Sequence, residues 1–173
     1  MKNITDKNLV FIGFMGAGKT TVGQLVAKKL NREFIDIDEG IEKEFHLSVS
    51  QIFKEYGEAA FREREKRLIA ELSKQKNLVL SPGGGAFLQE EVRNACLSSC
   101  LVIYLDISFA NWKDRVSLLM DTRPILQNKT FKEMEELYNS RQAMYANHHI
   151  KINIDDKAPE EIANLIIEKL PLK

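Results

Sequence analysis

Residues 13–20 read Gly-Phe-Met-Gly-Ala-Gly-Lys-Thr, and this stretch constrains the fold more than any other in the chain. It matches the pattern G-x-x-x-x-G-K-[ST] of a phosphate-binding loop. The apolar run 9–12 before it predicts a buried strand, and the helical spacing of apolar residues over 20–30 predicts a helix after it. Strand, glycine loop and helix come in the order that such a loop requires. The stretch therefore predicts a site for a nucleoside triphosphate.

The chemistry expected of this loop follows from its residue types. Glycines let backbone N–H groups turn toward a phosphate, and the N-terminus of the following helix adds partial positive charge. Lys19 is expected to reach the β- and γ-phosphates, and the Thr20 hydroxyl can ligate Mg²⁺. The residues predicted to bind the nucleotide here are Gly16, Ala17, Gly18, Lys19, Thr20 and Thr21.

Composition narrows the class of protein. With 173 residues, 44% of them hydrophobic and 29% charged, the chain suits one soluble globular domain. Lys+Arg and Asp+Glu number 25 each, so no nucleic-acid partner is expected. Neither a signal peptide nor a membrane-spanning run is visible, and the two cysteines, Cys96 and Cys100, are expected to be reduced core residues. These features favour a cytoplasmic protein, and a monomer is expected although no sequence pattern fixes the oligomeric state.

The rest of the chain alternates between strand and helix patterns. Further strands are predicted at 33–38, 78–80, 101–105 and 150–154. Helices are predicted at 39–45, 48–56, 58–74, 89–97, 108–118, 130–147 and 159–170. Five strands alternating with helices predict one α/β domain over 1–173, built on a doubly wound parallel sheet.

Two carboxylates mark the end of the second predicted strand. A strand over 33–38 has a period of two, which puts Asp36 and Asp38 on the same side near its carboxyl end. Ligands of open α/β sheets gather at that edge. The pair could serve Mg²⁺ through water or take a proton from a substrate hydroxyl. The alternative is that one of them, Asp38 above all, caps the helix predicted at 39–45.

A second group of charges lies on the helix predicted at 58–74. Arg62 and Glu65 fall on or beside its apolar face, where a charge is costly unless it is paired or used. Their spacing of three residues lets one orient the other. A salt bridge on the helix flank is the alternative.

Two strands end in residues that could belong to a site. Gly83, Gly84 and Gly85 follow the strand 78–80 and permit close approach of the backbone to a ligand, with a flexible turn as the alternative. Asp106 follows the strand 101–105 as a Walker B carboxylate would, but we expect it to cap the next helix.

Three arginines in the second half of the chain are candidates for anion binding. Arg123 stands before Pro124 in the polar stretch 120–129, a candidate lid that would fold over a triphosphate. Arg115 could meet the nucleotide base, with a solvated surface arginine as the alternative. Arg141 lies in an expected inward stripe of the helix 130–147, where it could bind a carboxylate or phosphate bidentately. The other members of that stripe are Phe131, Met134, Tyr138 and Tyr145.

In this order and at these spacings, the pieces resemble the shikimate kinase family, of the nucleoside-monophosphate-kinase-like P-loop group. The pieces that carry the resemblance are 13–23, 34–38, 61–65, 83–85, 123–126 and Arg141 before Tyr145. The resemblance implies a three-layer P-loop sandwich with strand order 2-3-1-4-5, a substrate-binding segment at about 38–65 and a lid at about 115–130. It also implies ATP-dependent phosphorylation of the shikimate 3-hydroxyl, with ATP and Mg²⁺ required.

The resemblance further implies roles for single residues. Shikimate would lie against Asp38, Arg62, Gly83, Gly84, Gly85 and Arg141, while Lys19, Asp38 and Arg123 would be catalytic. Thr20 would ligate Mg²⁺ with Asp36 acting through water, and Arg115, Arg123 and Lys157 would contact the nucleotide. The chain departs from the family pattern at Lys157, Pro82 and Ala143, where the family commonly has arginine, threonine and proline.

Other classes of nucleotide-binding protein share part of this sequence pattern. A kinase for gluconate or a nucleoside monophosphate would share the phosphate loop and the lid. A GTP-dependent switch would need Asn-Lys-x-Asp, but Asn128-Lys129 is followed by Thr130 and Phe131. A regulatory nucleotide-binding domain without catalysis stays open on the sequence alone.

Overall fold

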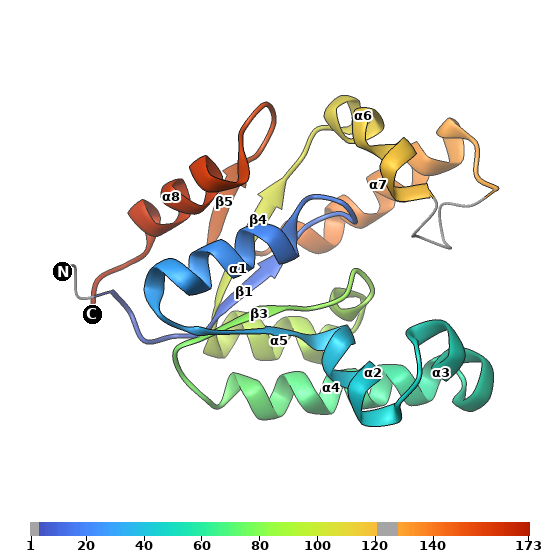
Figure 1. The fold of residues 1–173 in the computed structure, drawn as a ribbon, viewed down its shortest axis with the longest axis horizontal. Helices are drawn as coiled ribbons and strands as arrows, with labels where there is room; N and C mark the ends of the chain where they lie inside the picture. Colours follow the sequence, from blue (N-terminus) through green and yellow to red (C-terminus); the bar gives the residue numbers. More distant parts are fainter. Residues whose placement is uncertain (1–3, 121–127) are drawn as a thin grey trace.

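The computed structural model describes residues 4–120 and 128–173, and it contains one five-stranded parallel sheet (Figure 1). The strands are β1 (Leu9–Ile12), β2 (Glu33–Asp36), β3 (Leu78–Ser81), β4 (Leu101–Asp106) and β5 (Ile150–Asn153). Their order is β2-β3-β1-β4-β5, which confirms the predicted fold class and strand order. The register pairs Leu9 of β1 with Val79 on one side and Leu101 on the other.

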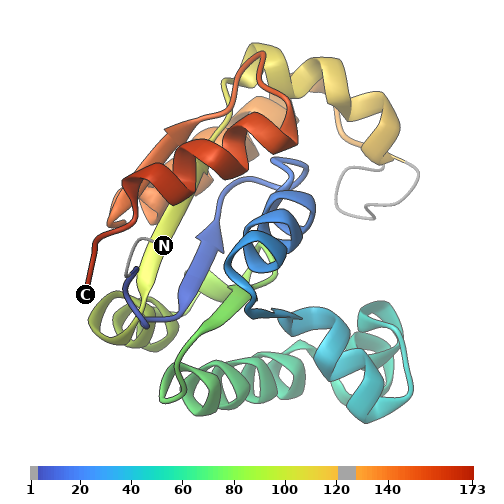
Figure 2. The same ribbon diagram turned by 60° about the vertical axis from the view of Figure 1, so that its left-hand side comes forward.

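Helices cover both faces of the sheet. They are α1 (Lys19–Leu30), α2 (Ile37–Phe45), α3 (Val49–Tyr56), α4 (Glu58–Ser73), α5 (Glu90–Ser99), α6 (Phe109–Met120), α7 (Phe131–Tyr145) and α8 (Pro159–Lys169), with a 3₁₀ turn η1 (Ala86–Leu88). Figures 1 and 2 show α1 and α8 side by side on one face and α5 on the other. Helices α2 and α3 pack against α4 as a separate group at one end of the molecule.

The central strands β1 and β3 are wholly buried, as their continuous apolar sequences require in a sheet covered on both faces. Cys96 and Cys100 are free thiols in the same core, as predicted. Burial raises the pKa of Cys96 to about 12 and that of Cys100 to about 11, so both thiols are unreactive near neutral pH. Within the described residues, no helix is long and apolar enough to cross a membrane.

Side-chain caps start helices α2, α3 and α7, and the cap of α2 corrects the sequence analysis. Ser48 and Gln51 form a capping box at the start of α3, in the stretch where a helix was predicted at 48–56. The prediction of a strand through Asp38 is wrong, because Asp36 already caps α2. Its Oδ1 accepts the backbone N–H of Glu39 at 3.0 Å, which turns the chain into helix two residues earlier than predicted. Asp38 therefore lies in the first turn of α2.

Two further expectations are also corrected. Asp106 does not cap α6, because the hydroxyl of Ser108 accepts the backbone N–H of Asn111 at 3.2 Å instead. Asp106 lies at the end of β4, where it pairs with Lys151 at 3.3 Å. Phe131 does not point inward on α7: it is the first residue of the helix and is 60% exposed.

Candidate active site

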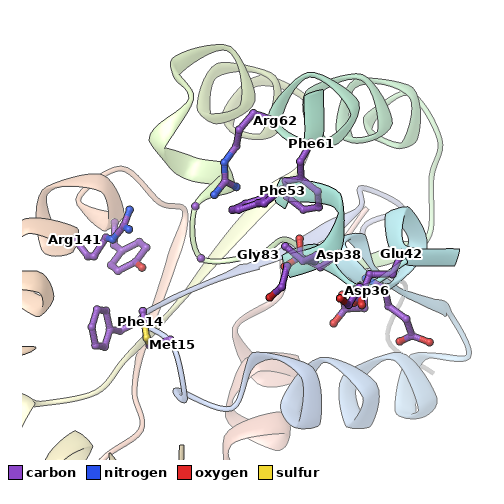
Figure 3. A pocket seen from close by; sticks show the side chains of 17 residues that line it. Phe14, Met15, Asp36, Asp38, Glu42, Phe53, Phe61, Arg62, Gly83 and Arg141 are labelled. Atoms are coloured by element: carbon purple, nitrogen blue, oxygen red, sulfur yellow. Dashed lines mark hydrogen bonds between the residues drawn. The ribbon is translucent and has the colours of Figure 1, made fainter. Parts of the chain in front are cut away.

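A cleft of about 810 Å³ brings together residues predicted from four separate stretches of the chain (Figure 3). The predicted site residues that line it are Asp36, Asp38, Arg62, Gly83, Gly84, Gly85 and Arg141. They come from the β2–α2 junction, from α4, from the loop after β3 and from α7. The cleft thus lies beyond the carboxyl ends of β2 and β3, where ligands of parallel sheets bind.

The glycine triplet packs directly against two charged side chains of the cleft. A β-carbon on Gly83 would overlap the Asp38 carboxylate, and one on Gly85 would overlap the guanidinium of Arg62. Gly84 lies between them, with open space where its β-carbon would be. At two positions of the triplet a side chain would therefore push the acid or the arginine out of place, so the close approach of the backbone that was expected there depends on glycine.

Arg62 is held on three sides. Its NH1 donates to Glu65 Oε1 at 2.9 Å, and its Nε lies 3.4 Å from Glu58 Oε1. The guanidinium carbon lies 5.9 Å from the ring centre of Phe53 and 5.4 Å from that of Phe61. The predicted orientation of Arg62 by Glu65 is confirmed, and the arginine is more constrained than a surface salt bridge would make it.

Glu65 is a fully buried carboxylate behind the arginine. Its Oε1 also accepts from Gln89 Nε2 at 3.0 Å. Burial raises the pKa of Glu65 to about 7, and the charge of Asp38 adds to the rise, while Arg62 and Gln89 work against it. Sequence reasoning missed Gln89 because it lies 24 residues away, at the start of α5, with no local pattern linking it to Glu65.

Arg141 enters the cleft from α7, which is anchored to the sheet by tyrosines. The Tyr138 hydroxyl donates to the carbonyl of Ile107 at 2.5 Å, and the ring of Tyr145 stacks on Tyr104 at 5.3 Å between centres. The Tyr104 hydroxyl lies 2.7 Å from Oε1 of Gln142. Helix α7 continues through Ala143 without a break, so Arg141 is carried by a regular helix fixed to β4.

The phosphate-binding loop lies beside this cleft, because two of its residues, Phe14 and Met15, line the cleft. Gly16 and Gly18 adopt left-handed backbone conformations, with φ of 78° and 87°, which other residues rarely take. Lys19 Nζ donates to the carbonyls of Gly13 at 2.6 Å and Phe14 at 3.2 Å. A second, much smaller cavity is lined by Lys19, Gly83 and Gly84 together, so the loop and the glycine triplet are neighbours.

A hydroxyl and a carboxylate meet where the predicted metal would bind. Thr20 Oγ1 lies 3.5 Å from Asp36 Oδ2, on the side of the carboxylate that does not cap α2. Both groups are hard oxygen donors, which suits Mg²⁺. No group of three or more His, Cys, Asp or Glu residues with metal-binding geometry occurs within the described residues.

Two of the predicted nucleotide contacts, Arg115 and Lys157, are not among the described residues that line this cleft. Arg115 is not simply solvated, because its NH1 lies 3.4 Å from the carbonyl of Gly16 in the loop. Lys157 lies in the turn after β5, where its Nζ is 3.5 Å from the carbonyl of Asp155. Arg123, and with it residues 121–127 of the predicted lid, lies outside the described residues.

The chain is similar to shikimate kinases over nearly its whole length. A family model described as shikimate kinase matches residues 15–171. The shikimate kinase of Bacillus subtilis is 50% identical over 170 residues, which is 98% of this chain and 91% of that protein. The shikimate kinase of Bacillus licheniformis is 51% identical, over 98% of this chain and 96% of that one.

Solved structures agree with the sequence comparison. The structure of shikimate kinase from Acinetobacter baumannii in complex with shikimate is similar, with a TM-score of 0.85 and 34% identity. The similarity covers 95% of this chain and 92% of that chain. With the family model spanning nearly the whole chain and relatives of this identity, the chain belongs to the shikimate kinase family.

Proposed function

We propose that the protein transfers the γ-phosphoryl group of ATP to the 3-hydroxyl of shikimate, giving shikimate 3-phosphate and ADP. The observation that carries the proposal is the single cleft in which Asp38, Arg62 and Arg141 meet beside the phosphate-binding loop. Membership of the shikimate kinase family supports the same reaction. The acceptor would lie in the cleft and the nucleotide on the loop.

The two arginines would bind the carboxylate of shikimate. They approach the cleft from different elements, α4 and α7 (Figure 3). The Glu65 contact orients the guanidinium of Arg62, and the anchored helix α7 fixes the backbone that carries Arg141. A planar guanidinium matches a carboxylate with two parallel hydrogen bonds. Fixing the carboxylate at this end would direct the ring hydroxyls toward the opposite wall.

Asp38 would accept hydrogen bonds from those hydroxyls. Its place against Gly83 keeps the carboxylate next to the triplet, and the small cavity behind Gly83 and Gly84 reaches Lys19. A carboxylate so placed can orient the attacking oxygen and take its proton as the new O–P bond forms. Backbone N–H groups of Gly83, Gly84 and Gly85 would add donors to the acceptor.

At the bound nucleotide, the protein would contribute mainly positioning and charge, because phosphoryl transfer requires little covalent chemistry from protein groups. Lys19 would leave the carbonyls of Gly13 and Phe14 for phosphate oxygens, and Arg123 would bind the same phosphates. When bound, Mg²⁺ would neutralise charge on the phosphates, held by Thr20 and, through water, by Asp36. Residues 16–21 would supply backbone and hydroxyl donors.

Two further contacts complete the proposal. Arg115, already beside the carbonyl of Gly16, would reach the nucleotide base, and Lys157 would approach it from the turn after β5. The whole of 1–173 would act as one domain, with the segment at about 38–65 on the acceptor and that at about 115–130 closing as a lid.

The test is an ADP-coupled assay with ATP and Mg²⁺ and a panel of acceptors: shikimate, gluconate and nucleoside monophosphates. We expect turnover with shikimate at least a hundredfold above the ATPase background and none with the others. Turnover of gluconate or of a nucleoside monophosphate in place of shikimate would overturn the proposal. ATP hydrolysis with no acceptor dependence would overturn it as well.

A further inference from the structure

Helix α6 contacts the phosphate-binding loop through Trp112, the chain's single tryptophan. Trp112 is fully buried, and its Nε1 donates to the carbonyl of Met15 at 2.8 Å. That carbonyl and the N–H of Gly16 belong to one planar trans peptide, so they point in opposite directions. A donor that holds the carbonyl of Met15 therefore also fixes the direction of the Gly16 N–H.

The indole is itself held in place by other rings, a group we call the aromatic cluster: Phe14, Phe109, Trp112 and Tyr138. Phe14, inside the loop, meets Trp112 edge-on at 5.1 Å between ring centres and Tyr138 at 5.3 Å. Phe109 stacks on Trp112 at 5.6 Å. The cluster leaves the indole little freedom, so its N–H is a fixed donor.

The neighbouring peptide of the loop is contacted from the same helix. Arg115, three residues after Trp112, has NH1 at 3.4 Å from the carbonyl of Gly16. Helix α6 thus supplies donors to two consecutive carbonyls, those of Met15 and Gly16. Apolar packing alone would need neither donor, since phenylalanine or leucine could fill the place of the indole.

We propose that Trp112 is a positioning residue for the nucleotide: its indole N–H orients the Met15–Gly16 peptide so that the Gly16 N–H faces the phosphates before they arrive. The inference rests on the proposed function in that the loop binds ATP or ADP. It goes beyond the phosphate-loop pattern, because it assigns part of the loop's geometry to a residue 97 positions away. Preorganised donors strengthen binding because less order has to be imposed on association.

A single tryptophan allows a test that separates the hydrogen bond from the packing. Produced in a tryptophan auxotroph supplied with β-(3-benzothienyl)alanine, the protein would carry sulfur in place of N–H at this position only, with nearly the same ring shape. Calorimetric titration with ADP, without shikimate, should give a dissociation constant roughly three- to tenfold weaker than that of the native protein, as expected for one hydrogen bond. The dissociation constant for shikimate should stay within twofold.

Two variants complete the experiment. Trp112→Phe also lacks the donor, should weaken ADP binding in the same direction, and replaces the isosteric protein if that does not fold. Lys113→Ala is the matched control on α6, since Lys113 contacts Phe109 and Phe131, and should leave ADP binding within twofold.

Two outcomes would overturn the inference. One is an ADP dissociation constant within twofold of native when the donor is absent, and the other is a loss of shikimate affinity as large as the loss for ADP. Because ADP binding is measured without an acceptor, a failure here is distinct from a failure of the native protein to turn over shikimate.

Discussion

Gly83 lies so close to Asp38 that a β-carbon on the glycine would overlap the carboxylate, and Gly85 stands in the same relation to Arg62. Two of the three glycines thus leave room for the Asp38 carboxylate and the Arg62 guanidinium at their places in the cleft. Gly84, between them, has open space at its β-position. The triplet sets the distance between the two charged groups that would hold opposite ends of the acceptor.

Replacing Gly83 by alanine should reduce turnover more than binding. The added methyl group would move Asp38 away from the reacting hydroxyl, and a displacement on the order of 1 Å can cost about a hundredfold in rate. We expect kcat to fall roughly 10- to 100-fold in the ADP-coupled assay. Gly40→Ala is the control, because its β-carbon would meet only Leu68 at an ordinary 3.7 Å and should leave kcat unchanged. An unchanged kcat in Gly83→Ala would contradict the assignment of Asp38.

Gly85→Ala should act on substrate affinity instead. Its methyl group would displace Arg62, so we expect the KM for shikimate to rise about tenfold or more, the size of one charged hydrogen bond. The KM for ATP should change less than twofold. Equal increases in both KM values would indicate general disruption of the sheet edge and would argue against Arg62 as a carboxylate ligand.

Glu65 should make stability depend on pH. Burial raises its pKa from 4.5 to about 7, so the folded state binds the proton more tightly than the unfolded state does. Its contribution to stability is then full below pH 4.5 and is lost as the pH rises through about 7. When the pH rises from 4.5 to 8, the unfolding free energy of Glu65→Gln should therefore increase relative to that of the native protein, by up to about 3 kcal/mol. Urea unfolding of both proteins at the two pH values measures this, and a difference that does not change with pH would count against it.

Asn8 should be a major determinant of stability. It is 1% exposed, its Nδ2 donates to the carbonyl of Leu72 at 2.9 Å, and its Oδ1 accepts the N–H of Leu78 at 2.9 Å. Asn8→Ala would leave both buried backbone groups unpaired, so we expect a loss of about 2 to 4 kcal/mol. Asn8→Asp keeps the acceptor for the N–H of Leu78 but places a carboxylate oxygen against the carbonyl oxygen of Leu72. This variant should be no more stable than Asn8→Ala. Urea unfolding that shows less than about 0.5 kcal/mol of loss would contradict this reading.

Much of the fold could be predicted from sequence, because β1, β3 and β4 are short apolar runs, β2 and β5 alternate, and helical patterns separate them. The phosphate loop fixed where the site would lie, and the later stretches supplied Asp38, Arg62 and Arg141, which the structure brings into one cleft. Local rules failed where two local signals compete. Strand periodicity extended β2 to Asp38, but the carboxylate of Asp36 accepts a helix N–H, and the cap prevailed.

Long-range contacts were beyond the sequence. Gln89 reaches Glu65 across 24 residues and Trp112 reaches Met15 across 97, and neither contact leaves a periodic trace. Phe131 shows the opposite error, since its helical spacing matched the inward stripe although its place at the first turn of α7 exposes it. A signal existed for Trp112: the chain's one tryptophan lies three residues before an arginine that was already a candidate.

The identity of the product shows directly whether the protein phosphorylates the 3-hydroxyl of shikimate. After incubation of the native protein with ATP, Mg²⁺ and shikimate, a two-dimensional ¹H–³¹P correlation spectrum should couple the new phosphorus to the proton on carbon 3 of the ring. That cross-peak should be absent without ATP or without protein. Coupling to the proton on carbon 4 or 5, or inorganic phosphate as the sole new phosphorus signal beside ADP, would contradict the account.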